Sequence, residues 1–137
     1  MPHDPARVQD TRAWLTKALM DLRAADHLLQ AHPPLRGSAV FHSQQAAEKA
    51  LKAFLAWHDE PFRRTHNLEE LGQQAAALDA TLQPVVDRAG WLTEYAWKFR
   101  YPGEPEEPSP EEAGEARALA HEVYAAVLAR LPEEARP

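Results

Sequence analysis

Apolar residues return along most of this chain with the spacing of α-helices. From position 15 to position 29, leucine and alanine recur every three or four residues and so fall on one stripe of a helix. Asp4 and Pro5 suit the start of this helix, since Asp can cap it and Pro fits its first turn. Pro33 and Pro34 end it, so the pattern predicts a first helix of nearly thirty residues.

A second helix is predicted over residues 38–58. One side of it is rich in alanine and serine, which allows another helix to approach closely. The opposite side is polar and consists of Gln44, Gln45, Glu48 and Lys52. Phe41 and Leu55 lie in the same stripe, so we expect the polar side to be the wall of a cleft or a second interface unless it is simply a solvated face.

Three further helices follow. Thr65 or Asn67 can cap a third helix that runs to Leu78. Pro84 suits the first turn of a fourth helix, which Pro102 should end at about Arg100. An acidic, proline-rich linker over residues 103–109 leads to the last helix.

The last helix opens with Ser109-Pro110-Glu111-Glu112, which has the pattern of a capping box with proline at the first position. Residues 132–137 are expected to be frayed. The sum is an all-α, up-and-down bundle of four to five helices, which we expect to form a single domain over residues 1–137.

The amino-acid composition limits the kinds of site and the cellular location that can be expected. The chain has no cysteine, so disulfides and thiolate metal sites are excluded. No apolar run is long enough to span a membrane and the first residues are too polar for a signal peptide, so we expect no membrane contact and a cytoplasmic location. No histidine and carboxylate pattern predicts a metal site and no glycine-rich phosphate loop occurs, so we expect neither metal nor cofactor.

The net charge of −6 is unevenly distributed along the chain. Residues 104–137 hold nine acidic and three basic side chains and so carry the whole surplus, whereas residues 36–66 are net positive by two. This balance argues against binding nucleic acid through a broad basic surface. It leaves room for a small anion site built from the middle of the chain together with Lys98 and Arg100.

The segment Trp91–Gly103 has the most unusual pattern, because an aromatic residue occupies every second position from Tyr95 to Tyr101. We expect Phe99 to face the core and Tyr95 and Tyr101 to lie on an exposed or subunit-facing side. Arg100 then either binds a phosphate or carboxylate beside Tyr101, or it caps the end of the helix while the aromatics fill a dimer interface. We expect all four tryptophans to be core or interface residues rather than a stacking platform.

Two other groups of residues are candidates for binding. The polar side of the second helix offers candidate nucleotide or phosphate contacts, namely Gln45, Glu48, Lys49 and Lys52. The loop before the third helix offers Arg63 and Arg64 as phosphate contacts and His66 as a base or donor, although His66 could instead cap the helix.

Three stretches of the chain carry a recognisable pattern: AVFHSQQAAEKALKAFLAWH at residues 39–58, FRRTHNLEEL at residues 62–71 and WKFRYPG at residues 97–103. Together they resemble the HEPN family, in its small prokaryotic stand-alone form. The resemblance implies an all-α bundle that forms a homodimer or higher homo-oligomer. It also implies nucleotide or RNA binding, and pairing with a minimal nucleotidyltransferase in a toxin–antitoxin-like module.

Several branches of that family are metal-independent ribonucleases that carry Arg, four to six residues, then His near the end of the bundle. Here no His follows Arg100 at that spacing, and the one match, Arg36 and His42, lies at the start of the second helix. The resemblance therefore favours a binding module. The alternative is a ribonuclease at a dimer interface that uses Arg100 with His66 or Tyr101, and a third possibility is an interaction bundle without a small ligand.

Overall fold

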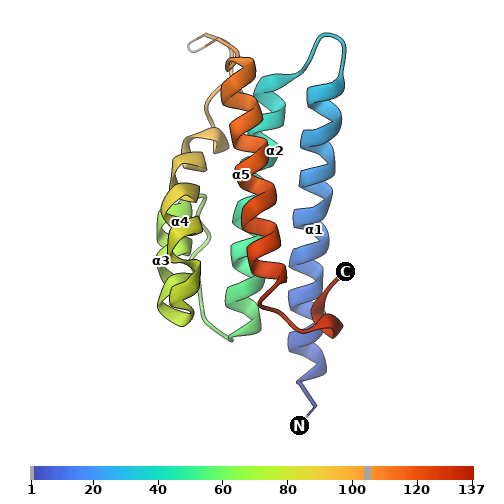
Figure 1. Ribbon diagram of the computed structural model, residues 1–137, viewed down its shortest axis with the longest axis vertical. Helices are drawn as coiled ribbons and strands as arrows, with labels where there is room; N and C mark the ends of the chain where they lie inside the picture. The colour runs from blue at the N-terminus through green and yellow to red at the C-terminus, as the bar shows by residue number, and fades with distance from the viewer. Residues whose placement is uncertain (1, 104–105) are drawn as a thin grey trace.

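In the computed structural model, residues 2–103 and 106–137 are described, and every regular element among them is helical. Three long helices lie side by side (Figure 1): α1 (Pro5–Gln30), α2 (Arg36–Trp57) and α5 (Pro110–Leu128). The shorter α3 (Leu68–Leu78) and α4 (Gln83–Ala89) pack beside α2 and α5. The predicted all-α bundle is confirmed, with five α-helices.

The helix starts follow the capping signals of the sequence. The Asp4 carboxylate accepts a hydrogen bond from the Ala6 amide at 3.0 Å, and the Ser109 hydroxyl accepts one from the Glu112 amide at 3.0 Å. At α3, the Asn67 side chain is the cap, and the Thr65 hydroxyl accepts from the Asn67 amide at 3.0 Å in the turn before it. Each cap satisfies an amide that the helix itself leaves unpaired.

The connection between α2 and α3 turns back along α2, so that α3 begins beside the middle of the bundle (Figure 1). Two contacts fix this path: the Gln44 side-chain amide donates to the backbone carbonyl of His66 at 3.2 Å, and Gln74 donates to the carbonyl of Pro61 at 2.8 Å. As a result, α3 runs in the same direction as α2, and α4 returns antiparallel to it before α5.

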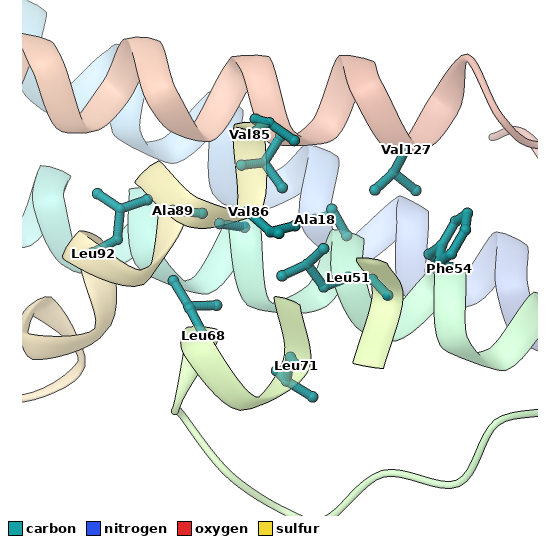
Figure 2. Packing of buried hydrophobic residues seen from close by; sticks show 14 of the residues in the cluster. Ala18, Leu51, Phe54, Leu68, Leu71, Val85, Val86, Ala89, Leu92 and Val127 are labelled. Carbon is teal, nitrogen blue, oxygen red and sulfur yellow. The ribbon is translucent and has the colours of Figure 1, made fainter. Parts of the chain in front are cut away.

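The core lies where α2 meets the other helices. Leu51 and Phe54 of α2 are 0 and 1% exposed, and they face leucines and valines from α3, α4 and α5 (Figure 2). Ala18 and Ala25 of α1 are fully buried. Because their side chains are small, α1 packs closely against α2. The alanine-rich side of α2 is thus buried as predicted.

The helix expected from Pro84 to Arg100 is α-helical only to Ala89. It continues as a 3₁₀-helix, η2 (Gly90–Ala96), and Phe99 takes a left-handed φ of 68°. This corrects the position of Tyr95, which was expected on an exposed or subunit-facing side and is fully buried within this chain. In a 3₁₀-helix every third residue falls on one side, so Tyr95 follows Leu92 into the core.

The C-terminal tail was expected to be frayed but packs against α1. A short 3₁₀-helix, η3 (Glu133–Ala135), brings Ala135 into the interior, and Arg12 of α1 donates a hydrogen bond to the carbonyl of Glu134. Buried alanine and backbone pairing stabilise the tail despite its polar sequence. The linker predicted over residues 103–109 lies in part outside the described residues, because positions 104 and 105 are not among them.

Candidate functional site

Glu48 is the centre of a buried polar cluster on α2. Its carboxylate is only 5% exposed, and three side chains surround it. Lys52 donates to one oxygen at 3.0 Å, and the other oxygen lies 3.1 Å from the Gln44 amide nitrogen and 2.8 Å from His66 Nδ1. The polar side of α2 is therefore not a solvated face; the returning loop covers it and is anchored to it.

Lys52 is held in a largely apolar setting. Its ammonium lies 5.5 Å from the ring centre of Trp14 and 5.7 Å from that of Phe62, while its side chain is 10% exposed. Aromatic faces and one carboxylate together compensate a desolvated cation. Lys52, proposed from the sequence as a phosphate contact, is thus a buried ion-pair partner of Glu48.

A second cluster joins α1 to α2 through Asp21. His42 Nδ1 lies 2.8 Å from one carboxylate oxygen, and Lys49 Nζ lies 2.6 Å from the other. Burial by itself would raise the pKa of Asp21, but the hydrogen bonds from His42 and Lys49, with their charges, lower the pKa below the ordinary 3.8. The carboxylate fixes the orientation of the His42 ring.

Asp21→Asn should destabilise the fold by about 1–3 kcal/mol at neutral pH. Because the native pKa of Asp21 is lowered, the contribution of this carboxylate is complete above the unfolded value of about 3.9 and is lost as the pH falls through the lower native value. The difference in unfolding free energy between wild type and variant should therefore shrink below about pH 4. Urea denaturation at several pH values measures it, with the exposed Asp10→Asn as control; a difference that is constant with pH would contradict the assignment.

Arg100 lies against the start of α2. Its guanidinium carbon is 4.1 Å from the ring centre of Phe41 and 5.8 Å from that of Tyr101, and one guanidinium nitrogen donates to the carbonyl of Ala96 at 3.2 Å. The side chain is exposed, and the structure gives it no carboxylate partner within the part of the chain it describes. Arg100 therefore caps η2 and still presents a free edge.

Arg100 and His42 line the same hollow. It measures about 300 Å³ and is bounded by the first turns of α2 and by Phe99. Beside it, the Gly37 amide donates to the Glu107 carboxylate and Arg36 Nε donates to the carbonyl of Pro108 at 2.7 Å. The hollow thus combines an exposed arginine, an oriented histidine and an aromatic ring, a set of groups suited to a phosphate, while the Gly37 amide at the start of α2 is already bound to Glu107.

His66 belongs to a different hollow. This second one, of about 370 Å³, is lined by His66, Thr93 and Trp97 together with residues of the α3 cap. Trp97 and Arg100, three residues apart on one short segment, therefore line different hollows. The other loop candidates lie at the surface: Arg63 pairs with Glu70 at 2.7 Å, and Arg64 is exposed.

Comparison with protein-family models identifies a HEPN domain over residues 11–131. The chain belongs to the HEPN family. The match spans all five α-helices except the first turns of α1, and it includes both hollows. HEPN domains are associated with nucleotide- and RNA-related functions and commonly dimerise. Neither the curated proteins nor the solved structures contain a match to the chain.

In this HEPN domain the sequence-derived candidates divide into three groups. Arg100 and Tyr101 are exposed and lie next to each other at the first hollow, whereas His66 lines the second, so the structure brings Arg100 together with Tyr101 but not with His66. Glu48, Lys49 and Lys52 are engaged in the two ion-pair clusters. Gln45 is half-buried and donates to Gln44 at 2.7 Å, so it extends the Glu48 cluster.

The residues that share the first hollow with Arg100 could not be read from the sequence. The Arg-x5-His match joins His42 to Arg36, and its place at the start of the second helix gave no reason to connect His42 with Arg100. Phe41 was seen only as an apolar residue in a polar stripe. The signal that could have joined them is the aromatic next to a histidine, Phe41-His42, in the first turns of α2.

Two further observations concern ligands and membranes. Nowhere among residues 2–103 and 106–137 do three or more histidine or acidic side chains come together in a geometry that would hold a metal ion. Within the same residues, none of the helices has the combination of length and apolar character needed to cross a bilayer.

Proposed function

We propose that this HEPN domain is a nucleotide- or RNA-binding module that recognises a phosphate at the hollow lined by Arg100, Phe41 and His42. The observation that carries the proposal is the exposed Arg100 guanidinium, stacked on Phe41 at 4.1 Å and left without a carboxylate partner in the described chain. A guanidinium oriented by an aromatic ring can bind a phosphate through two parallel hydrogen bonds.

Other cations near the segment are less available. Lys49 is bound to Asp21, Lys52 to Glu48 and Lys98 to Glu94 at 3.1 Å. Each of these lysines already has its charge compensated, so it would have to give up an ion pair before it could bind a phosphate. We therefore assign the first contact to Arg100 and give Lys49 and Lys52 a role in holding α2 in place.

Exposed aromatic rings support RNA as the ligand. Trp97 and Tyr101 are 55 and 68% exposed, although large apolar side chains are usually buried. Of the four tryptophans, which were expected in core or interface positions, Trp14 and Trp57 pack against the core, whereas Trp91 and Trp97 are exposed on this chain. Bases of single-stranded RNA stack on such exposed rings while a nearby cation binds the backbone.

Assembly is part of the proposal. We propose a homodimer or higher homo-oligomer that works as the HEPN half of a toxin–antitoxin-like system with a minimal nucleotidyltransferase. Support comes from the family, whose members commonly dimerise.

The net charge of −6 favours a small, defined binding site over a broad basic surface. The position of Arg100, Trp97 and Tyr101 on a single short segment favours it as well.

Arg100→Ala should weaken binding of single-stranded RNA by about ten- to a hundredfold, the effect of losing a charge-assisted contact to phosphate. The slope of log affinity against log salt should fall by about one. Arg100→Lys should bind with intermediate affinity, because it keeps the charge and loses the planar fork. Fluorescence anisotropy with a labelled RNA measures both, and the exposed Lys17→Ala, which removes the same charge from α1, is the matched control.

The proposal fails if wild-type protein does not bind RNA or nucleotide, or if Arg100→Ala and Lys17→Ala weaken binding equally. Equal loss would mean that only the overall charge matters. Unfolding in urea should differ by less than about 0.5 kcal/mol between Arg100→Ala and wild type, since the side chain is exposed.

A metal-independent ribonuclease is the second candidate, and it rests on one observation: His42 is oriented by Asp21 at 2.8 Å and lines the hollow that Arg100 lines. A histidine held by a carboxylate can act as general base or acid, and Arg100 would stabilise the negative charge that develops on the non-bridging phosphate oxygens. Cleavage of the same RNA that disappears in both His42→Ala and Arg100→Ala would favour this candidate. RNA that stays intact while it is bound would favour the binding module.

A further inference from the structure

An open apolar groove lies between α4–η2 and α5, distinct from both hollows described above. It measures about 480 Å³. Trp91, which is 43% exposed, and Leu119, which is 8% exposed, supply its apolar lining. The Trp91 ring packs edge-to-face on the buried Tyr95 ring, with ring centres 5.6 Å apart.

The groove is elongated along α5. One face of α5 lines it, with Glu115 at position i, Ala118 at i+3, Leu119 at i+4 and Glu122 at i+7. At 1.5 Å per residue this face extends over about 10 Å, roughly two helical turns. A shallow trough of this length matches the apolar face of a second helix better than it matches an enclosed small molecule.

The rim of the groove is acidic. Asp87, Glu115 and Glu122 contribute three carboxylates, and Arg88 contributes one cation that is already paired with Glu122. Within the residues that the structure describes, no cation is paired with Glu115. Burial first, then its hydrogen bond to Glu112 and the charges of Glu112, Glu94 and Glu115, raise the pKa of the neighbouring Tyr95.

We propose that this groove is a docking surface for a cationic amphipathic segment of a partner protein. An arginine or lysine of that segment would pair with Glu115 and lie over Trp91, and an apolar side chain would cover Leu119. A second copy of this chain fits less well, because a two-fold symmetric contact through the groove would bring its carboxylates against the same carboxylates of the partner copy. The inference does not depend on the proposed RNA site.

Two short helical peptides test the inference directly. Both carry leucine on one face; one has lysine and arginine on its polar face, and the other has glutamate at every one of those positions. The cationic peptide should bind the full chain and the acidic peptide should not. Glu115→Lys should weaken binding of the cationic peptide by about tenfold, whereas Glu133→Lys, which changes the net charge equally at the exposed tail, should change it by less than about twofold.

The site of binding is measured by crosslinking. The chain has no cysteine, so Ala118→Cys introduces a single position in the groove for a photocrosslinker, and Ala13→Cys places the same label on the exposed side of α1. Strong crosslinking of the cationic peptide from position 118 and weak crosslinking from position 13 would support the proposal. Absence of binding, equal weakening by Glu133→Lys, equal crosslinking from the two positions, or crosslinking of position 118 to a second copy of the chain would overturn it.

Discussion

Replacing Glu48 by alanine is expected to lower the free energy of unfolding by about 3–5 kcal/mol, the usual cost of leaving a buried ion without its partner. The substitution leaves Lys52, whose side chain is 10% exposed, without its carboxylate partner and next to the rings of Trp14 and Phe62. It also removes the partner of His66 and so weakens the attachment of the loop that returns along α2, leaving the contacts of Gln44 and Gln74. Chemical denaturation followed by circular dichroism measures the change.

Two further variants make this expectation specific. Glu122→Ala breaks the surface pair with Arg88, in which both side chains are about half exposed, and should have a much smaller effect. The double variant Glu48→Leu with Lys52→Met removes both charges and should lose less stability than Glu48→Ala alone, because no ion is left buried. If Glu48→Ala behaves like Glu122→Ala, the cluster does not hold the loop to α2.

The helices themselves could be predicted from the sequence because their determinants are local. The repeat of apolar residues, the caps at Asp4, Asn67 and Ser109, and the proline pairs act within a few residues of each helix end. The error at Tyr95 is also local in origin. The α-helical spacing of apolar residues predicts that the α-helix continues through residues 90–96, which instead fold as a 3₁₀-helix. Because a 3₁₀-helix has fewer residues per turn, the direction of the Tyr95 side chain differs from the one an α-helix would give it.

The site was harder to predict because its contacts are distant in sequence. His66 reaches Glu48 only because the connection doubles back along α2, and no local pattern indicates that path. Arg100 meets Phe41 and His42 across nearly sixty residues of sequence. The sequence did single out Arg100 and the polar side of α2, and the structure separates their roles. The buried charges of α2 support the fold, and the exposed arginine is left available for a ligand.

Gly72→Ala should disrupt the packing of α3 on α4. A β-carbon at Gly72 would lie 2.9 Å from the β-carbon of Val86, an atom that cannot move without its helix. The two helices must separate, and overpacking of this kind costs about 1–3 kcal/mol. Since α4 leads directly into η2 and the Trp97–Tyr101 segment, we also expect weaker RNA binding in this variant.

Gly114→Ala is the matched control, because the same substitution in α5 should have the opposite sign. Gly114 is exposed, and an added β-carbon meets nothing within 4 Å. Alanine there restricts the unfolded chain and favours the helix, so the variant should be more stable by about 0.4–1 kcal/mol. Urea titrations of both variants decide the matter. If Gly72→Ala is as stable as Gly114→Ala, α3 and α4 are not in close contact at this point, and the position of the Arg100 segment must be set by its contacts with α2 alone.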